Sequence, residues 1–218
     1  MLINMVEPVL QANDAIAAEN KALLEHQGVF EVNLMGSPGS GKTAILERTL
    51  EALYSLRVGV IEGDITTTMD ADRLARFGIP VAQINTEPFG GDCHLAAHVI
   101  KKALDSFDLS ALDLLFVENV GNLVCPAEFE IGEHRKVVVL SATEGEDKPL
   151  KYPLMFRVCH AVLISKMDLV PYLDVDLAKL RGNINAVNPK LQIIQVSAKT
   201  GDGIESWINW LRAAMQTR

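Results

Sequence analysis

The sequence predicts a single α/β domain over residues 1–218, built on a mainly parallel sheet of seven strands with helices on both faces. The first observation is a series of short apolar, β-branched runs that alternate with stretches of helical periodicity. Their near-continuous hydrophobicity is typical of strands buried on both faces. The runs are residues 30–35, 58–61, 81–84, 114–117, 137–140, 161–164 and 193–196. The helical patterns cover residues 70–77, 94–107, 174–188 and 203–215.

The segment before the first strand predicts an N-terminal amphipathic helix. About residues 7–27 carry apolar side chains at helical spacing, and Gly28 is a natural end for such a helix. We find no internal repeat, low-complexity tract or long linker in the sequence. One domain therefore accounts for the chain.

Composition and charge narrow the classes of function. The chain is 49% hydrophobic and 22% charged, which is ordinary for a globular protein. Its net charge of −8 argues against general affinity for nucleic acid or anionic lipid. No apolar run approaches the roughly 20 residues that span a membrane, and Met1–Glu7 does not resemble a signal peptide. Three cysteines cannot all pair within one chain. We expect a cytoplasmic protein without nucleic-acid or membrane partners.

A glycine-rich loop follows the first predicted strand. Residues 36–43 fit the pattern G-x-x-x-x-G-K-S/T, between an apolar run and a helical stretch. Such a P-loop directs backbone N–H groups toward phosphate oxygens at a helix N-terminus. Lys42 would reach the β/γ-phosphates, and the Thr43 hydroxyl would bind Mg²⁺. The alternative is an ordinary turn before a helix. The expected phosphate-binding residues are Gly36, Ser37, Gly39, Ser40, Gly41, Lys42 and Thr43.

Carboxylates follow two further strands. Asp64 comes at the end of the second strand, where it could hold Mg²⁺, and Asp70 could orient an attacking water. The alternative for Asp70 is an acid in the first turn of a helix. Glu118 follows the fourth strand, at the acidic Mg²⁺-holding position of P-loop nucleotidases. No Gln follows Gly121, so we expect slow hydrolysis that uses another group, with Lys42, Asp64, Asp70 and Glu118 as the catalytic set.

Two short motifs predict recognition of guanine. Residues 165–168 (Ser-Lys-Met-Asp) and 197–199 (Ser-Ala-Lys) match the N/T-K-x-D and S-A-K elements of GTPases. Asp168 can accept hydrogen bonds from guanine N1–H and its exocyclic amine, whereas adenine offers neither. Ser165 stands where Asn is commoner, and we expect a looser loop there. ATP remains the alternative nucleotide. The residues expected at the base are Lys166, Asp168, Ser197, Ala198 and Lys199.

A cysteine and histidine set lies beside these segments. We expect Asp92 to cap a helix whose first turn holds Cys93 and His94, which would lower the thiol pKa. Cys125 lies a few residues beyond Glu118. Two thiols and an imidazole suit Zn²⁺ or Ni²⁺ and leave a fourth position open. The alternative is two small buried cysteines and a surface histidine.

Together these motifs resemble the HypB-type nickel-insertion GTPases of [NiFe]-hydrogenase maturation. The resemblance includes the P-loop and residues 90–94, 118–126 and 144–153. It implies a SIMIBI-like GTPase that uses GTP and Mg²⁺ and binds Ni²⁺ or Zn²⁺ at Cys93, His94 and Cys125. It further implies a GTP-promoted homodimer and nickel delivery to the hydrogenase large subunit. A small nickel- and zinc-binding maturation protein would be a partner.

The sequence departs from this pattern in two places. Residues 1–30 contain only His26 and no cysteine, so a nickel-storage tract or cysteine cluster is missing there. Related dimerising nucleotidases place a lysine early in the P-loop, and this chain has Ser37. Lys148 is our candidate for a nucleotide contact across a dimer, and a solvated surface lysine is its alternative.

Other functions remain open from sequence. A urease accessory GTPase carries Cys-Pro-His, whereas Ala127 follows Cys125 and Pro126 here. A chaperone GTPase for a cobalamin enzyme would not need the cysteine and histidine set. A nucleotide-gated scaffold with structural zinc would show little turnover.

Overall fold

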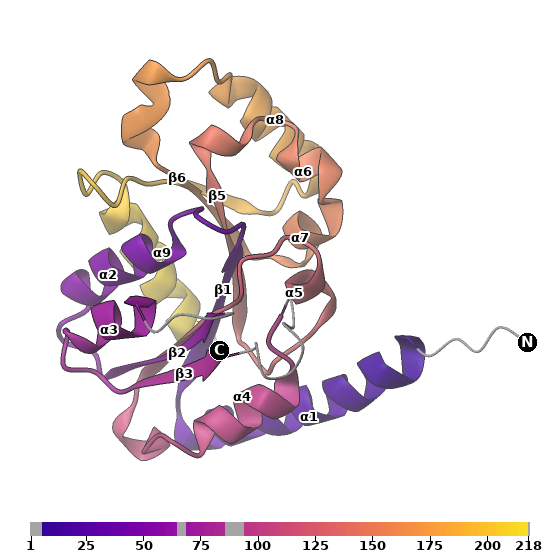
Figure 1. The fold of residues 1–218 in the computed structure, drawn as a ribbon, viewed down its shortest axis with the longest axis vertical. Coiled ribbons are helices and arrows are strands. Elements are labelled where there is room, and N and C mark those ends of the chain that lie inside the picture. Colours follow the sequence, from indigo (N-terminus) through magenta and orange to yellow (C-terminus); the bar gives the residue numbers. More distant parts are fainter. Residues whose placement is uncertain (1–5, 65–68, 86–93, 218) are drawn as a thin grey trace, which may run out of the picture.

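The sheet has the predicted parallel arrangement. The computed structural model describes residues 6–64, 69–85 and 94–217. Within that part of the chain, seven strands pair in the order β3-β2-β4-β1-β5-β6-β7, and every pairing is parallel (Figure 1). The strands are β1 (Phe30–Gly36), β2 (Val58–Asp64), β3 (Val81–Asn85), β4 (Leu114–Glu118), β5 (Arg135–Ser141), β6 (Ala161–Ser165) and β7 (Gln192–Gln195).

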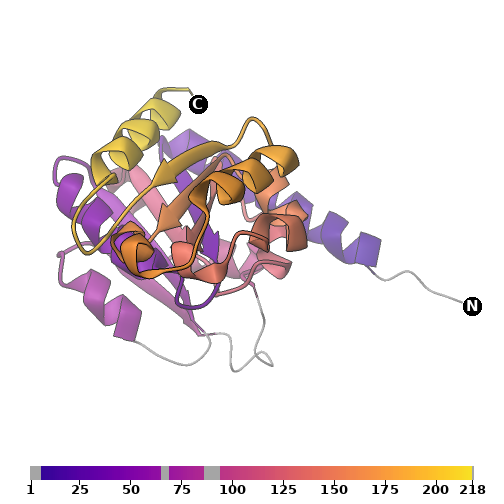
Figure 2. The ribbon, with the colours of Figure 1, turned by 90° about the horizontal axis from the view of Figure 1, so that it is seen from above.

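Helices cover both faces of the sheet (Figures 1 and 2). Buried side chains place α2, α3 and α9 on one face, and α1, α4, α5, α7 and α8 on the other. The short helices α5 to α7 were not predicted. The bounds are α1 (Val6–Gln27), α2 (Lys42–Ala52), α3 (Met69–Ala75), α4 (Ala97–Leu104), α5 (Cys125–Glu128), α6 (Lys148–Lys151), α7 (Pro153–Val158), α8 (Leu177–Val187) and α9 (Ile204–Gln216).

The central strand β1 explains why the two faces differ. Phe30, Val32 and Leu34 alternate toward the α2 and α9 side, since successive side chains of a strand point to opposite faces. Between them, Glu31 and Asn33 are fully buried polar residues. The face covered by α1 and α4 therefore has a polar centre inside an apolar core.

The start of α4 corrects one prediction. We expected a helix from His94 capped by Asp92, but α4 begins at Ala97 and its N-cap residue, Ala96, is extended (φ −85°, ψ 157°). A hydrogen bond from the Leu95 N–H to the Asn119 side chain holds the chain in this extended form. His94 therefore precedes the helix. Asp92 and Cys93 lie outside the described residues, and a helix-lowered thiol pKa has no support.

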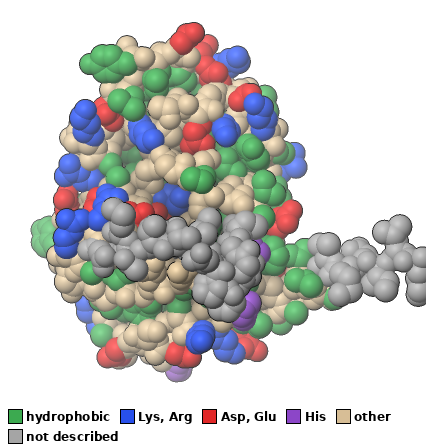
Figure 3. Space-filling view, in the orientation of Figure 1, with side chains coloured by type: hydrophobic (Ala, Val, Ile, Leu, Met, Phe, Trp, Pro, Cys, Tyr) green, Lys and Arg blue, Asp and Glu red, His purple; other side chains and the backbone are tan. Residues whose placement is uncertain are grey.

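Three further features concern the outer surface and the helices. The N-terminal half of α1 extends beyond the edge of the domain (Figures 1 and 2). On the face drawn in Figure 3, acidic and basic side chains are interspersed and do not form one basic patch. Within the described ranges, no helix combines the length and the hydrophobicity needed to cross a membrane.

Candidate nucleotide and metal site

The P-loop connects β1 to α2 at the centre of the sheet. Gly41 occupies the left-handed region (φ 101°) as the N-cap of α2, where no side chain caps the helix. A Cβ on Gly36 would come within 2.4 Å of the Val139 carbonyl oxygen, so only glycine fits there. The first-turn N–H groups of α2 are thus left for an anion, as the motif predicts. Gly39 and Ser40 complete the turn, with Ser40 N–H donating to the Ser37 oxygen at 3.1 Å.

Lys42 is buried among carboxylates at the base of this loop. Its Nζ lies 3.4 Å from both the Gly36 and the Ser37 carbonyl oxygens. Burial lowers the pKa of Lys42, while Glu118 and nearby acids oppose this by raising the pKa. A cavity of about 360 Å³ opens beside it. The cavity is lined by Pro38, Gly39, Gly41, Lys42, Thr43, Ala44, Glu62, Gly63, Asp70, Arg73, Glu118, Asn119, Val120 and Gly121.

Thr43 and Glu118 meet inside the same cavity. The Thr43 hydroxyl donates to Glu118 Oε1 at 2.8 Å, and Glu118 is only 4% exposed. Glu118 Oε2 has no hydrogen-bond partner among the described residues. Burial raises the pKa of Glu118 to about 7, against the effects of Lys42 and Thr43. A buried carboxylate beside a hydroxyl is a suitable oxygen ligand pair for Mg²⁺, whose charge would offset the desolvation.

The two aspartates have different outcomes. Asp64 ends β2, the strand that pairs with Glu118's strand, but its side chain lies outside the description. Asp70 lies in the first turn of α3 and lines the cavity. Its Oδ1 accepts from Arg73 at 2.9 Å, and Arg73 also pairs with Glu47 at 2.6 Å. The position agrees with a first-turn acid and also with access to a nucleotide. Arg73 was missed because an arginine in an amphipathic helix is ordinarily a surface residue.

The two segments that are predicted to recognise the base are attached to the P-loop. The Ser165 hydroxyl donates to the Ser40 carbonyl oxygen at 2.5 Å, and Lys166 Nζ donates to the Gly39 oxygen at 2.7 Å. The Ser197 hydroxyl donates to Asp168 Oδ1 at 2.7 Å. The expectation of a looser loop at Ser165 is therefore wrong, because this serine itself reaches the P-loop.

Arg48 is a second residue that the sequence did not reveal. Its Nε donates to the Ala198 carbonyl oxygen at 2.6 Å, and a terminal nitrogen lies 3.4 Å from the Lys199 oxygen. The contact joins α2 to the segment after β7, across 150 positions of sequence. No local pattern distinguishes Arg48 from a solvated helix residue.

We predict that Ser165→Ala weakens GTP and GDP binding alike, by about fivefold, since one hydrogen bond is worth about 1 kcal/mol. The Ser40 carbonyl loses its donor, and the P-loop then has one fewer anchor to β6. Equilibrium titration of both nucleotides measures the effect. Ser110→Ala is the matched control, because the Ser110 hydroxyl bonds only to the exposed Asp108 in the described structure. Equal affinities in Ser165→Ala and the native chain would contradict the prediction.

The segment after β4 joins the nucleotide cavity to Cys125. A Cβ on Gly121 would come within 2.9 Å of Pro38, so the segment lies directly against the P-loop. Asn122 N–H donates to the Gly36 oxygen at 3.0 Å. Four residues beyond Gly121, Cys125 begins α5, and its Sγ lies 3.6 Å from Asn122 Nδ2.

The structure places His94 close to the C-terminal end of α5, the helix that begins at Cys125. The His94 ring stacks on Phe129, the residue after α5, with ring centroids 3.9 Å apart. Cys93 falls outside the described residues, so the third member of the expected set is untested. Among the described residues, no group of three or more His, Cys, Asp or Glu forms a metal site. Cys159 is separate: it is buried beside Met155, and burial raises its pKa.

Lys148 lies beside the P-loop rather than in open solvent. Its Nζ is 3.9 Å from Glu144 Oε2 and 5.3 Å from the centre of the Tyr152 ring. Glu144 in turn accepts from the Ser37 hydroxyl at 2.6 Å. The side chain is 27% exposed, and it lines an open cavity with Ser37 and Gly121. A fully solvated lysine is therefore not what the structure shows.

Comparison with known proteins identifies the family. A family model described as the CobW/HypB/UreG nucleotide-binding domain matches residues 30–195. The hydrogenase maturation factor HypB of Azotobacter vinelandii is 47% identical over 218 residues, which are all of this chain and 71% of that protein. The chain belongs to the HypB family. Its nucleotide-binding domain is thus shared with the HypB hydrogenase maturation factors.

Solved structures agree with this HypB assignment. The crystal structure of HypB from Helicobacter pylori in complex with nickel has a TM-score of 0.89 and 38% identity, over 94% of this chain and 96% of that one. A LAO/AO transport system kinase, at 15% identity and a TM-score of 0.57, covers all of this chain and 78% of its own. This second likeness shows the fold alone. The predicted single α/β domain with a parallel seven-stranded sheet is confirmed.

Proposed function

We propose that this HypB-family chain is a Mg²⁺-dependent GTPase that delivers nickel during maturation of [NiFe]-hydrogenase. The observation that carries the proposal is one continuous segment, residues 118–125. Glu118 at its start contacts Thr43, and Gly121 abuts Pro38. Cys125 ends it as the first residue of α5, and His94 stacks on Phe129, the residue after that helix. One segment therefore serves both sites, so nucleotide and metal can influence one another.

The chain's own groups account for phosphate binding and slow hydrolysis. Lys42 and the α2 N-terminus would neutralise phosphate charge, and the Thr43 hydroxyl and Glu118 carboxylate would hold Mg²⁺ together with Asp64. Bound Mg²⁺ would supply charge neutralisation at the β- and γ-phosphates. Asp70 is the candidate for orienting water. Its pairing with Arg73 restrains it, which supports the proposal that the isolated protein turns over slowly.

Guanine is the base that the chain favours. Asp168 offers a carboxylate to the guanine N1–H and amine, and the Ser197 hydroxyl holds one of its oxygens in place. The Ala198 N–H would donate to guanine O6, while Arg48 fixes that segment through the Ala198 carbonyl. Lys166 covers the base with its aliphatic stem.

The metal cargo would bind at Cys93, His94 and Cys125. Thiolate and imidazole ligands suit Ni²⁺ and Zn²⁺ alike. The crystal structure of the H. pylori HypB in complex with nickel supports Ni²⁺ as the cargo proposed here. The stacking of His94 on Phe129, next to α5, supports the approach of two of the three ligands.

The same proposal includes partners. We infer a GTP-promoted homodimer in the cytoplasm, in which Lys148 contacts the nucleotide of the second subunit after leaving Glu144. Its place beside Ser37, where related nucleotidases carry a lysine, supports this role. The hydrogenase large subunit and a small nickel- and zinc-binding maturation protein would receive and supply the metal.

Metal analysis of cysteine variants tests the proposal. We expect Cys93→Ala and Cys125→Ala each to lose stoichiometric Ni²⁺ or Zn²⁺ binding but to retain GTP binding. Cys125 is not among the described residues that line the phosphate cavity, and the proposal assigns Cys93 to the metal alone. Cys159→Ala is the matched control, since this buried thiol packs against Met155 and should not affect metal content. Metal bound equally by all three variants would overturn the metal site. Absence of Mg²⁺-dependent GTP turnover in the native chain would overturn the GTPase.

A further inference from the structure

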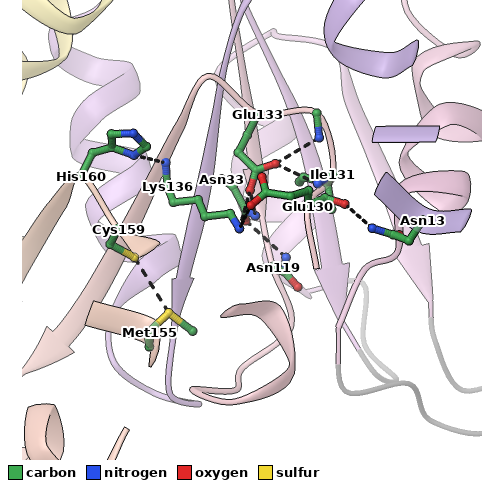
Figure 4. A network of polar contacts seen from close by, with 11 residues as sticks. Asn13, Asn33, Asn119, Glu130, Ile131, Glu133, Lys136, Met155, Cys159 and His160 are labelled. Atoms are coloured by element: carbon green, nitrogen blue, oxygen red, sulfur yellow. Dashed lines mark hydrogen bonds and ion pairs between the residues drawn. The ribbon is translucent and has the colours of Figure 1, made fainter. Parts of the chain in front are cut away.

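A line of buried hydrogen bonds runs from the core of the sheet to the residue after His94. Asn33 Nδ2 donates to Glu133 Oε1 at 3.0 Å, and Asn119 Nδ2 donates to Asn33 Oδ1 at 3.2 Å (Figure 4). Asn119 Oδ1 then accepts from the Leu95 N–H at 3.2 Å. Asn33, Asn119 and Glu133 are 0%, 1% and 7% exposed. The line therefore connects β1 and the end of β4 to the turn that precedes α4.

The Glu133 carboxylate sets which group donates and which accepts in each hydrogen bond of this line. Glu133 Oε2 accepts from the Ile131 and Gly132 N–H groups at 2.8 and 3.0 Å, and Lys136 Nζ lies 3.6 Å from Oε1. A carboxylate that only accepts requires Asn33 to present its NH₂ group. The Asn33 oxygen must then face Asn119, whose NH₂ group is used there. The carbonyl of Asn119 is thereby turned toward Leu95.

Asn119 is also part of the segment that borders the nucleotide. It follows Glu118, which contacts Thr43, and its own N–H donates to the Leu34 oxygen at 3.0 Å. Gly121, two residues later, abuts the P-loop. A displacement of this segment on a change of nucleotide moves the acceptor of the Leu95 N–H with it.

The turn at Leu95 is held on its other sides by fixed elements. The Leu95 side chain is 1% exposed and packs on β2, where a Cβ on Gly63 would come within 2.7 Å of it. From α1, Asn13 Oδ1 accepts from the Ala97 N–H, and Asn20 Nδ2 donates to the Ala97 oxygen, both at 2.9 Å. A shift of the Asn119 contact therefore acts on a short, restrained segment that includes His94.

We propose that Asn119 is the positioning residue through which the nucleotide sets the place of His94, and with it the affinity for the metal cargo. The inference rests on the proposed function and adds the physical link between its two sites. Asn119 acts through the Leu95 backbone, and Glu133 acts through Asn33 to keep the Asn119 amide in its orientation. The side-chain oxygen and the side-chain nitrogen of Asn119 both form hydrogen bonds within the protein.

The test is the ratio of Ni²⁺ affinities in the GDP-bound and GTP-analogue-bound full chain with Mg²⁺. We expect the native ratio to lie in the usual range for coupled sites, about 5- to 150-fold, and Asn119→Ala to bring it within about twofold of one. Asn33→Leu should lower the ratio too. Leucine is similar in size to asparagine, and the Asn33 side chain hydrogen-bonds to Glu133 and Asn119 but not to Leu95 or Glu118. The ratio of GTP-analogue affinity to GDP affinity, measured with and without Ni²⁺, must change by the same factor.

Asn183→Ala is the matched control. Its Nδ2 donates to the Glu146 carbonyl at 2.8 Å, so the variant loses a comparable amide hydrogen bond on α8. It should lower the unfolding temperature as Asn119→Ala does, yet keep the native ratio. Native ratios in both Asn119→Ala and Asn33→Leu would overturn this inference and leave the proposed function standing. A native chain whose Ni²⁺ affinity ignores the nucleotide would overturn the coupling itself, and if Asn119→Ala does not fold, Asn33→Leu decides.

Discussion

Asp168→Asn should lower the affinity for GTP by about a hundredfold to several thousandfold, because two hydrogen bonds to a charged carboxylate contribute about 3–5 kcal/mol. In the variant, an amide NH₂ group would face the guanine N1–H or its amine, where a donor meets a donor. The same amide can pair with xanthine, which carries a carbonyl oxygen in place of the guanine amine. We therefore expect the affinity for XTP to rise as that for GTP falls.

Titration of Asp168→Asn and the native chain with GTP, XTP and ATP measures this exchange of preference. Asp176→Asn is the matched control, because Asp176 caps α8 by accepting from the Lys179 N–H. That variant should retain the native order of nucleotides. An Asp168→Asn protein that still prefers GTP over ATP would show that another residue reads the base. The contact from Ser197 predicts that the variant stays folded, since the hydroxyl can bond to either side chain.

Lys42→Ala should abolish measurable nucleotide binding at micromolar concentrations, since loss of a charged donor to phosphate costs about 2–4 kcal/mol, or roughly 30- to 1,000-fold. A second effect adds to this. Lys42 is the main group that opposes the burial-raised pKa of Glu118, which lies at about 7 in the native chain. Without Lys42, that pKa rises further, so more of Glu118 is protonated at pH 7 and Mg²⁺ loses a ligand.

Nucleotide titration and molecular mass in solution, each with Mg²⁺ and a GTP analogue, test this prediction. Lys42→Ala should remain monomeric where the native chain dimerises. Lys101→Ala is the control, because it also removes one cation, but from an exposed pair with Glu19. A dimer that forms equally in Lys42→Ala would contradict nucleotide-promoted association. Retained GTP binding would contradict the role of Lys42 in the P-loop.

Strand positions were predictable because each strand carries its own signal. The apolar runs that begin at residues 30, 114 and 161 lie within the observed β1, β4 and β6. The runs in β4 and β6 are continuously hydrophobic because both faces of these strands are buried. The short helix α5 was missed because four residues that begin with Cys125-Pro126 show no helical period. The start of α4 was misplaced because Asp92 fits the local N-cap pattern, whereas the Leu95 N–H is bonded to Asn119 and the helix begins only after the extended Ala96.

The P-loop, the two segments predicted to recognise the base and the parallel sheet that aligns them could all be located from the sequence. These are local patterns, and parallel strands bring their carboxyl ends to one edge wherever the helices lie. Tertiary structure alone decided what supports them. Arg48 reaches Ala198 across 150 positions, Asn33 reaches Glu133 across 100, and Asn119 reaches Leu95 across 24. Such contacts depend on how helices and strands pack. The sequence alone does not distinguish a buried asparagine from an exposed one.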